Sequence, residues 1–267
     1  MKIAITGSHG FVGSHLVSHI RAAHAGDIQL TALTRQGFDL TSPDTWETLP
    51  HDIDCFIHAA SLIDGPLYDV YAANALYIPA LVSFLNRRGV GKFIYLSTGA
   101  VYGALSEPAT PDMPENPSTA YPVSKYLAER NITDNFNGVV NILRLYFPYG
   151  TNLELPRLLP KLIQRIRQGE TIYCNRDGGP WLSLVHVDDI SEIIINDFAL
   201  TPRPSGKWNI ASDETVALRD IAERIAAALR VPLKISETGN AENVTSIPYV
   251  RQDGRPWRLF DVGDILG

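Results

Sequence analysis

Cysteine is scarce in this chain: Cys55 and Cys174 are the only two among 267 residues, and neither belongs to a CxxC pair. This spacing excludes a disulfide framework or a cysteine-based zinc site as the organising feature. Long apolar runs are also missing, since none approaches the roughly 20 residues that a membrane-spanning helix needs. The opening segment MKIAITG has the pattern of a strand, so we expect no signal peptide and no membrane partner.

Basic clusters are missing too. Lys and Arg total 23 against 29 Asp and Glu, which gives a formal charge of -6. Without a basic run or stripe, a nucleic-acid partner is not expected. Hydrophobic residues make up 45% of the chain, enough for a large core in one α/β unit or in one domain with a smaller partner. We expect a soluble, cytoplasmic protein.

What is present, first of all, is an alternation of short apolar runs and amphipathic stretches. Strands are predicted at residues 2–6, 29–34, 55–59, 92–97 and 139–145, and helical stretches at 13–25, 43–49, 68–87 and 121–136. Strands that alternate with helices in this way predict βαβ units around a buried parallel sheet.

The pattern changes after about residue 150. Helices are predicted at 158–167, 188–200 and 216–229, and short strands at 171–174 and 181–185. The fold class is therefore α/β: a Rossmann-type doubly wound parallel sheet with a small C-terminal substrate lobe. We assign residues 1–150 to a dinucleotide-binding domain and 151–267 to the lobe, which is interleaved with that domain and does not fold independently. The lobe should cover the sheet's C-terminal edge, where such folds bind ligands.

Three glycines follow the first predicted strand, at Gly7, Gly10 and Gly13. The first permits a tight turn, the second lets backbone amides approach a pyrophosphate, and the third allows close packing of helix on strand. Phosphates then lie at the positive end of the helix. An ordinary strand-to-helix turn is the alternative, but the position directly after the first strand favours dinucleotide binding.

The end of the second strand bears on which dinucleotide is bound. An Asp or Glu there would bind the ribose hydroxyls of NAD, whereas this chain has Thr34 and Arg35. An arginine can neutralise a 2′-phosphate, and the hydroxyl of Thr34 can add a hydrogen bond. The residues favour NADP as the cofactor and leave NAD possible; the alternative is that Arg35 is a solvated loop residue.

A Y-x-x-x-K pair stands at Tyr121 and Lys125. Residues four apart share a helix face, and Pro122 fits only the first turn, so Tyr121 should lie near a helix N-terminus. We expect the cation and the helix terminus to lower the phenol's pKa. The tyrosine could then exchange a proton with an alcohol while hydride moves to or from a nicotinamide.

A hydroxyl at the end of the fourth predicted strand strengthens this interpretation. Ser97 or Thr98 would face the cofactor cleft from the sheet edge and could orient a substrate carbonyl for hydride transfer. Without that context, the tyrosine and lysine could be a surface helix pair.

These residues resemble the extended short-chain dehydrogenase/reductase family, the NAD(P)-dependent epimerase/dehydratase group. The blocks that carry the resemblance cover nearly the whole chain: TGSHGFVG at 6–13, HAA at 58–60, STGAVYG at 97–103, ENPSTAYPVSK at 115–125, ILRLYFPYG at 142–150, LVHVDDI at 184–190 and KWNIASDETVALRDIAERIA at 207–226.

The resemblance implies a role for each matching position. Thr98 would be the catalytic hydroxyl, Tyr121 the acid/base, and Lys125 a residue that also holds the nicotinamide ribose. The implied cofactor-binding set comprises Gly7, His9, Gly10, Phe11, Val12, Gly13, Thr34, Arg35, Asp39, Leu40, Ala59, Ala60, Ser61, Asn74, Ser97, Tyr121 and Lys125. No metal site is expected.

Departures from the family pattern bear on the reaction. The dehydratases carry Asp-Glu where this chain has Gly99 and Ala100, so dehydration is disfavoured. Some double epimerases place a cysteine where Ala100 stands, which disfavours that reaction too. Phe147, Trp181 and Leu182 replace polar positions of sugar-nucleotide enzymes, so we expect them to form an apolar wall. The chain also ends where many relatives continue into a terminal helix, which implies a reduced substrate lobe.

Other charged residues allow two interpretations. Arg251, Arg255 and Arg258 could meet a phosphate or belong to a solvated basic loop, and His58 and His186 fit structural roles better than a metal or base role. By family analogy we expect a homodimer through helices 68–87 and 121–136.

The leading hypothesis is an NADP-preferring reductase or dehydrogenase acting on a carbonyl or alcohol of a small, sugar-like substrate. The alternatives are an NAD-dependent sugar-nucleotide C4 epimerase and a catalytically idle dinucleotide-sensing scaffold. Substrate choice should depend on the loops at 62–68, 104–117, 151–157 and 175–182.

Overall fold

A six-stranded parallel sheet forms the centre of the computed structural model, which describes residues 1–154, 157–239 and 243–266. Its strand order is β10-β5-β4-β3-β1-β2. The strands are β1 (Lys2–Thr6), β2 (Gln29–Ala32), β3 (Cys55–His58), β4 (Lys92–Thr98), β5 (Val139–Leu145) and β10 (Gly206–Ile210). This order confirms the predicted Rossmann-type α/β fold.

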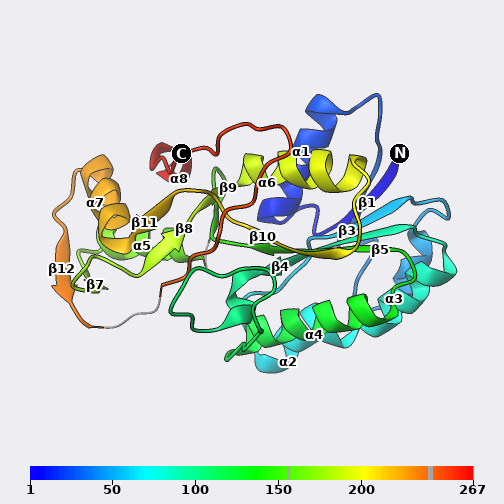
Figure 1. The fold of residues 1–267 in the computed structure, drawn as a ribbon, viewed down its shortest axis with the longest axis horizontal. Coiled ribbons are helices and arrows are strands. Elements are labelled where there is room, and N and C mark those ends of the chain that lie inside the picture. The colour runs from blue at the N-terminus through cyan, green and yellow to red at the C-terminus, as the bar shows by residue number, and fades with distance from the viewer. Residues whose placement is uncertain (155–156, 240–242, 267) are drawn as a thin grey trace.

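Helices cover both faces of the sheet (Figure 1). On one face lie α1 (Phe11–Ala23) and α6 (Val187–Ile193), and on the other α2 (Leu67–Tyr71), α3 (Ile78–Arg87) and α4 (Ala120–Asn135). Alternate residues of a strand point to opposite faces. Ile3 and Ile5 accordingly join the core under α1 and α6, while Ala4 joins the core under α3 and α4.

The long helix predicted at 68–87 is interrupted. A π-helical segment, η2 (Ala72–Leu76), separates α2 from α3, and Pro79 at the start of α3 offers no backbone N–H. Single π-helical turns are common at functional sites. Here the turn carries Asn74, which is buried and hydrogen-bonded to the loop after β3.

The predicted helix at 188–200 also changes type, because α6 passes into the π-helical η4 (Ile194–Leu200). The Lys92 ammonium donates to the carbonyls of Phe198, Ala199 and Thr201 at its end. The predicted helix at 43–49 is instead the 3-10 helix η1 (Pro43–Thr48). Helix α1 begins at Phe11 rather than Gly13.

A smaller lobe lies at one end of the sheet (left in Figure 1). Its helices are α5 (Leu158–Arg167) and α7 (Leu218–Leu229), which pack into a third apolar core. Its short strands are β7 (Thr171–Cys174), β8 (Trp181–Ser183), β11 (Thr215–Ala217) and β12 (Lys234–Glu237). The remaining short elements are η3 (Gly99–Tyr102), β6 (Pro148–Tyr149), β9 (Val185–His186) and α8 (Gly263–Leu266).

Two predictions in this half of the chain need correction, and one strand was not predicted. The strand predicted at 181–185 is divided, because β8 pairs with β11 and β9 pairs with β6. Helix α7 begins at Leu218 rather than Val216, because Thr215–Ala217 is drawn into that pairing. No strand was predicted at Gly206–Ile210, yet β10 completes the central sheet.

Segments from after residue 150 therefore return to the dinucleotide-type sheet, as β10 and as α6. The division at residue 150 remains a prediction. Within the described ranges, the helices are all too short or too polar to cross a membrane.

Candidate active site

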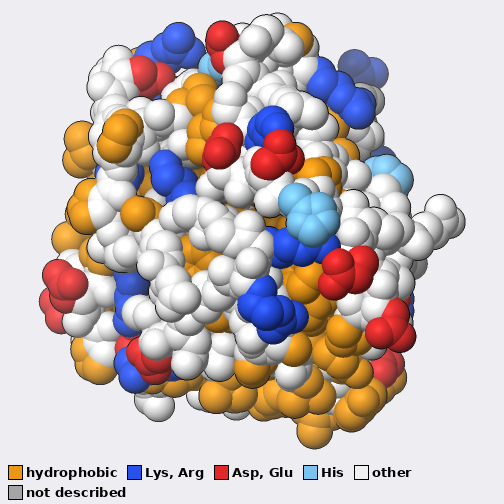
Figure 2. All heavy atoms as spheres, turned by 90° about the vertical axis from the view of Figure 1, so that its right-hand side faces the viewer, with side chains coloured by type: hydrophobic (Ala, Val, Ile, Leu, Met, Phe, Trp, Pro, Cys, Tyr) orange, Lys and Arg blue, Asp and Glu red, His pale blue; other side chains and the backbone are white. Residues whose placement is uncertain are grey.

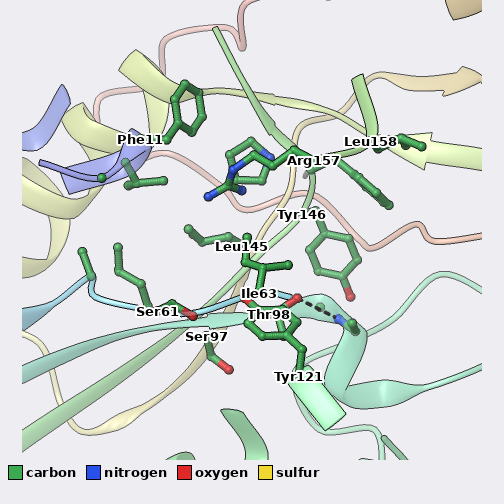
Figure 3. A pocket seen from close by; sticks show the side chains of 18 of the residues that line it. Phe11, Ser61, Ile63, Ser97, Thr98, Tyr121, Leu145, Tyr146, Arg157 and Leu158 are labelled. Atoms are coloured by element: carbon green, nitrogen blue, oxygen red, sulfur yellow. Dashed lines mark hydrogen bonds between the residues drawn. The ribbon is translucent and has the colours of Figure 1, made fainter. Parts of the chain in front are cut away.

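A cavity of about 520 Å³ opens at the carboxyl ends of β1, β3, β4 and β5 (Figure 3). Several predicted residues line it: Gly7, Gly10, Phe11, Val12, Ala59, Ala60, Ser61, Ser97, Thr98 and Tyr121. The other predicted residues lie outside its lining: His9, Gly13, Thr34, Arg35, Asp39, Leu40, Asn74 and Lys125. The cavity thus unites the glycine loop with the threonine and tyrosine.

The glycine loop has the tight geometry that its spacing predicts. Gly7 has φ +67°, and a Cβ there would lie 2.6 Å from the backbone nitrogen of Ala60. A Cβ on Gly13 would lie 2.0 Å from the carbonyl oxygen of Gly7. At Gly10 the contact is only with that same oxygen, at 3.2 Å. The first and third glycines therefore allow close packing, and the loop fits a dinucleotide's diphosphate beside the N-terminus of α1.

Arg35 projects into solvent just after β2, with 85% of its side chain exposed. Its Nε lies 3.4 Å from Oδ2 of Asp39, whose Oδ1 accepts hydrogen bonds from the backbone and hydroxyl of Thr41 at 2.9 and 2.8 Å. Burial raises the pKa of Asp39, but these bonds and the nearby arginine outweigh that effect and lower it overall. Asp39 therefore stays ionised and pairs with Arg35.

Thr98 and Tyr121 come from the end of β4 and the first turn of α4. The hydroxyl of Thr98 accepts a hydrogen bond from the backbone of Ala100 at 3.2 Å. Burial raises the pKa of Tyr121 above its usual value, although hydrogen bonding to Ser61 and Thr98 and the charge of Arg157 lower it. Tyr121 therefore keeps its proton at neutral pH and is poised as an acid.

Lys125 shares a face of α4 with Tyr121 and is 1% exposed. Its ammonium lies 4.1 Å from the centre of the Tyr95 ring. Burial lowers its pKa to about 7, although the Glu129 carboxylate raises it. The expectation that this lysine and the helix terminus lower the pKa of Tyr121 is wrong, because burial raises that pKa and also leaves the lysine only partly charged at neutral pH.

A buried ionic network, which we call the α4 network, lies behind these residues. Glu129 accepts hydrogen bonds from Ser97 and from Arg144, whose Nη2 is 2.6 Å from Glu129 Oε2. Arg144 also pairs with Glu115, which pairs in turn with Lys207. Burial raises the pKa of Glu115, but these two cations lower it to about 2. We did not predict this network, although the spacing of Glu129 from Lys125 places both on one helix face.

Asn74 connects the π-helical segment η2 to α4, the helix that carries Tyr121. Its Oδ1 accepts from the hydroxyl of Ser61 at 3.0 Å and the backbone of Leu62 at 2.9 Å. Its Nδ2 donates to the carbonyl of Leu62 at 2.8 Å and the hydroxyl of Ser124 at 3.1 Å. Asn74 therefore positions Ser61, whose hydroxyl opposes the rise that burial causes in the pKa of Tyr121.

His58 is a core residue at the end of β3. Its ring stacks on the Tyr95 ring with 5.5 Å between the two ring centres, and its Nδ1 is 2.8 Å from the Thr6 hydroxyl oxygen. Burial lowers its pKa to about 3, so it is neutral at physiological pH. His186 caps α6 by accepting from the backbone of Asp188.

The C-terminal arginines are paired with carboxylates. Arg251 lies 3.1 Å from Asp189 and 2.6 Å from Glu192. Arg258 lies 3.0 Å from Asp189, and Arg255 lies 3.4 Å from Glu192. None of the three lines the cavity. They hold the C-terminal segment against α6. Arg251 is buried, so the solvated-loop interpretation is wrong for it, whereas Arg255 and Arg258 are 65% and 42% exposed, as that interpretation expects.

The predicted apolar wall is only partly present. Phe147 lines the cavity together with Tyr146 and Leu158. Trp181 lies in a separate small pocket and Leu182 is buried outside the cavity lining, so including these two in the wall was wrong.

Position 99 has no room for a side chain. A Cβ on Gly99 would lie 2.3 Å from Cζ of Tyr146, closer than atoms can approach without movement. The Tyr146 side chain is 2% exposed and belongs to the core cluster that also contains Val101. A carboxylate at this position is therefore incompatible with the present packing.

The sequence model of the NAD dependent epimerase/dehydratase family matches residues 3–211. The chain belongs to this family. Among its relatives is GDP-6-deoxy-D-mannose reductase of Pseudomonas aeruginosa, 36% identical over 88% of this chain and 82% of that protein. UDP-glucose 4-epimerase of Mycolicibacterium smegmatis is 24% identical over 87% of this chain and 84% of that protein.

Solved structures agree with this family fold. UDP-glucose 4-epimerase of Thermus thermophilus in complex with NAD superimposes with a TM-score of 0.77 at 22% identity, over 93% of this chain and 91% of that one. MoeE5 in complex with UDP-glucuronic acid and NAD gives 0.79 at 20% identity, over 97% and 95%. The family member described here is thus a nicotinamide dinucleotide-dependent enzyme with an extended short-chain dehydrogenase/reductase fold.

The chemistry of this family member can be divided between the cofactor and the chain. A bound nicotinamide dinucleotide supplies or accepts hydride. The chain supplies a phenol at Tyr121 that can give a proton to a substrate oxygen, and a hydroxyl at Thr98 that can orient that oxygen. Lys125 has a pKa of about 7, so it is a cation in part of the molecules. It can assist the return of a proton to Tyr121.

Proposed function

We propose that this enzyme reduces the keto group of a nucleotide-linked 6-deoxy sugar. The observation that carries the proposal is the packing of Tyr146 over Gly99, where a Cβ would lie 2.3 Å from the ring. It leaves a proton-donating tyrosine without a carboxylate at position 99 for eliminating water. The 36% identity to a GDP-6-deoxy-D-mannose reductase supports the same reaction type.

In this reaction a hydride from the reduced dinucleotide adds to the carbonyl carbon, and the Tyr121 proton goes to the carbonyl oxygen. The carbonyl becomes a secondary alcohol and the dinucleotide is oxidised. Thr98, at the end of β4, donates a hydrogen bond to the same oxygen. Because burial raises the pKa of Tyr121, the phenol starts protonated, as this direction requires.

The test is to incubate the enzyme with reduced dinucleotide and a panel of GDP-, dTDP- and UDP-linked 4-dehydro-6-deoxyhexoses. We expect one dinucleotide to be oxidised per sugar reduced. Tyr121→Phe should lower kcat about 10²- to 10⁴-fold, the range for general acid catalysis, while Tyr126→Phe on the same helix serves as control. Tightly bound NAD with interconversion of sugar epimers and no net oxidation would instead establish the epimerase.

We also propose NADPH as the preferred reductant. Its support is the exposed Arg35, whose only described ion pair is the 3.4 Å contact with Asp39. Arg35→Ser should weaken NADPH binding about tenfold, as expected for one charge-assisted contact, and leave NADH binding unchanged. Fluorescence titration measures both, with exposed Arg21→Ser as control. Equal loss for the two dinucleotides would contradict the preference.

We further propose that the enzyme is a cytoplasmic homodimer, joined through the surface of α2, η2 and α4. Leu67, Tyr68, Leu76 and Leu127 are 64%, 68%, 53% and 47% exposed there. Figure 2 shows hydrophobic side chains gathered along the lower edge, the side on which these helices lie in Figure 1. Exposed apolar patches commonly mark interfaces. Sedimentation of the wild-type protein should give twice the 29.4 kDa chain mass. The double variant Tyr68→Glu, Leu127→Glu should give the mass of one chain. Cell fractionation tests the cytoplasmic location.

A further inference from the structure

Arg157 is the only charged residue in the described lining of the cavity. It immediately precedes α5 in the smaller lobe. Its guanidinium carbon lies 5.3 Å from the centre of the ring of Phe11, which is the first residue of α1. In Figure 3 the side chain reaches across the cavity toward Phe11, on the side opposite Tyr121. The Arg157 cation thus extends from the smaller lobe toward the glycine loop before α1.

The guanidinium of Arg157 has no ion pair or hydrogen bond within residues 1–154, 157–239 and 243–266. Burial lowers its pKa, and the only group that raises it is Tyr121. An arginine nevertheless keeps its charge in proteins. A partly desolvated cation without a partner costs free energy that an incoming anion can recover.

The N-terminal end of α1 presents further donors beside it. Helix α1 is 13 residues long, has no side-chain cap, and has no acidic residue in its first turn. The first N–H groups of a helix lack intrahelical partners and favour anions. The Arg157 guanidinium lies near the first residue of α1, so both sets of donors could bind one ligand, and two sets suit an extended group such as a diphosphate better than a single carboxylate.

We propose that Arg157 binds the diphosphate of a ligand in this cavity. Two ligands carry that group: the nicotinamide dinucleotide and, resting on the proposed function, the nucleotide-linked sugar. Because Arg157 lies near Phe11, the bound diphosphate would contact both Arg157 and the glycine loop. Binding would thus hold α5 and α1 together through the ligand. The role is distinct from that of Arg35, which lies outside the cavity lining.

The experiment compares Arg157→Gln and Arg157→Lys with Arg167→Gln, an exposed arginine at the other end of α5. Dissociation constants are measured by calorimetry for NADPH, ADP-ribose, GDP, UDP and dTDP, after thermal unfolding has shown that each variant is folded. We expect Arg157→Gln to weaken binding about 10- to 100-fold, as for loss of a charged hydrogen-bonding partner. Arg157→Lys should retain part of the affinity, and Arg167→Gln all of it.

The source of the diphosphate follows from which ligands are affected. Parallel losses for NADPH and ADP-ribose assign the contact to the dinucleotide, whereas losses confined to the nucleoside diphosphates assign it to the substrate. The proposal is overturned if every dissociation constant stays within about twofold of wild type, even if kcat changes. Because dinucleotide binding needs no sugar substrate, this outcome is separate from failure of the proposed reductase activity.

Discussion

Two arginines, Arg144 and Arg157, lie on two sides of the candidate active site and differ in whether carboxylates of the chain neutralise their charge. Arg144 is 0% exposed beside α4 and pairs with Glu129 and Glu115. Burial alone would lower its pKa, yet these partners raise it. Arg157 faces the cavity without a carboxylate, and burial lowers its pKa. A charge that the chain itself neutralises stabilises the fold, while a charge left without a partner is available to a ligand.

The strongest test of this comparison measures the free energy of unfolding, where we expect the largest difference between variants of the two arginines. Arg144→Met would leave Glu129 buried without its partner, so the free energy of unfolding should fall by about 3–5 kcal/mol. Arg157→Met removes no ion pair and should change it by less than about 1 kcal/mol. Urea denaturation of the ligand-free protein measures both. Equal losses would show that Arg157 is also a structural residue.

A second effect concerns packing on the catalytic side. Gly99→Ala places a Cβ 2.3 Å from the Tyr146 ring, and such overpacking should cost about 1–3 kcal/mol of unfolding free energy. Combining it with Tyr146→Leu, which shortens the opposing side chain, should recover part of the loss. Thermal unfolding of the three variants checks this expectation. An undisturbed Gly99→Ala protein would mean that position 99 can accept a side chain and that the packing of Tyr146 does not keep a carboxylate out.

The smallest effect is on pH dependence. Lys125 is charged below its pKa of about 7, so reductase activity that uses its charge should decline as pH rises through that value. Because the Glu129 carboxylate raises this pKa, Glu129→Gln should move the decline to lower pH, by about one unit for a charge partner of about 1.4 kcal/mol. Asp134→Asn, exposed on the same helix, is the control. A shift to higher pH would contradict the assigned cause.

The fold and the placement of Tyr121 and Lys125 on one helix face could be predicted because their signals are local. Gly7, Gly10 and Gly13 follow one strand within a single turn, and Tyr121 and Lys125 lie one helical turn apart, so spacing alone places them. The resemblance to the family then selected Thr98. The position of Ser61 beside Tyr121 depends on Asn74, which bridges separate segments.

Long-range features could not be read from the sequence. Lys207 lies 92 residues from its partner Glu115, and the guanidinium of Arg157 reaches Phe11 on another element. The polar segment around Lys207 gave no strand signal because β10 is an edge strand, whose pairing with β5 supplies its conformation. The π-helical η2 was missed because its residues have ordinary helical composition.

The position of β10 also bears on how the chain acquires its structure during synthesis. A nascent chain that ends at residue 150 contains five of the sheet's strands, but β5 has no neighbour on its outer side until Gly206–Ile210 has been made. An open edge of this kind pairs readily with other chains. In a fragment of residues 1–150 the buried strand β5 would form that edge, whereas the whole chain ends its sheet in the partly buried β10. We therefore expect the fragment to aggregate more readily than the whole chain.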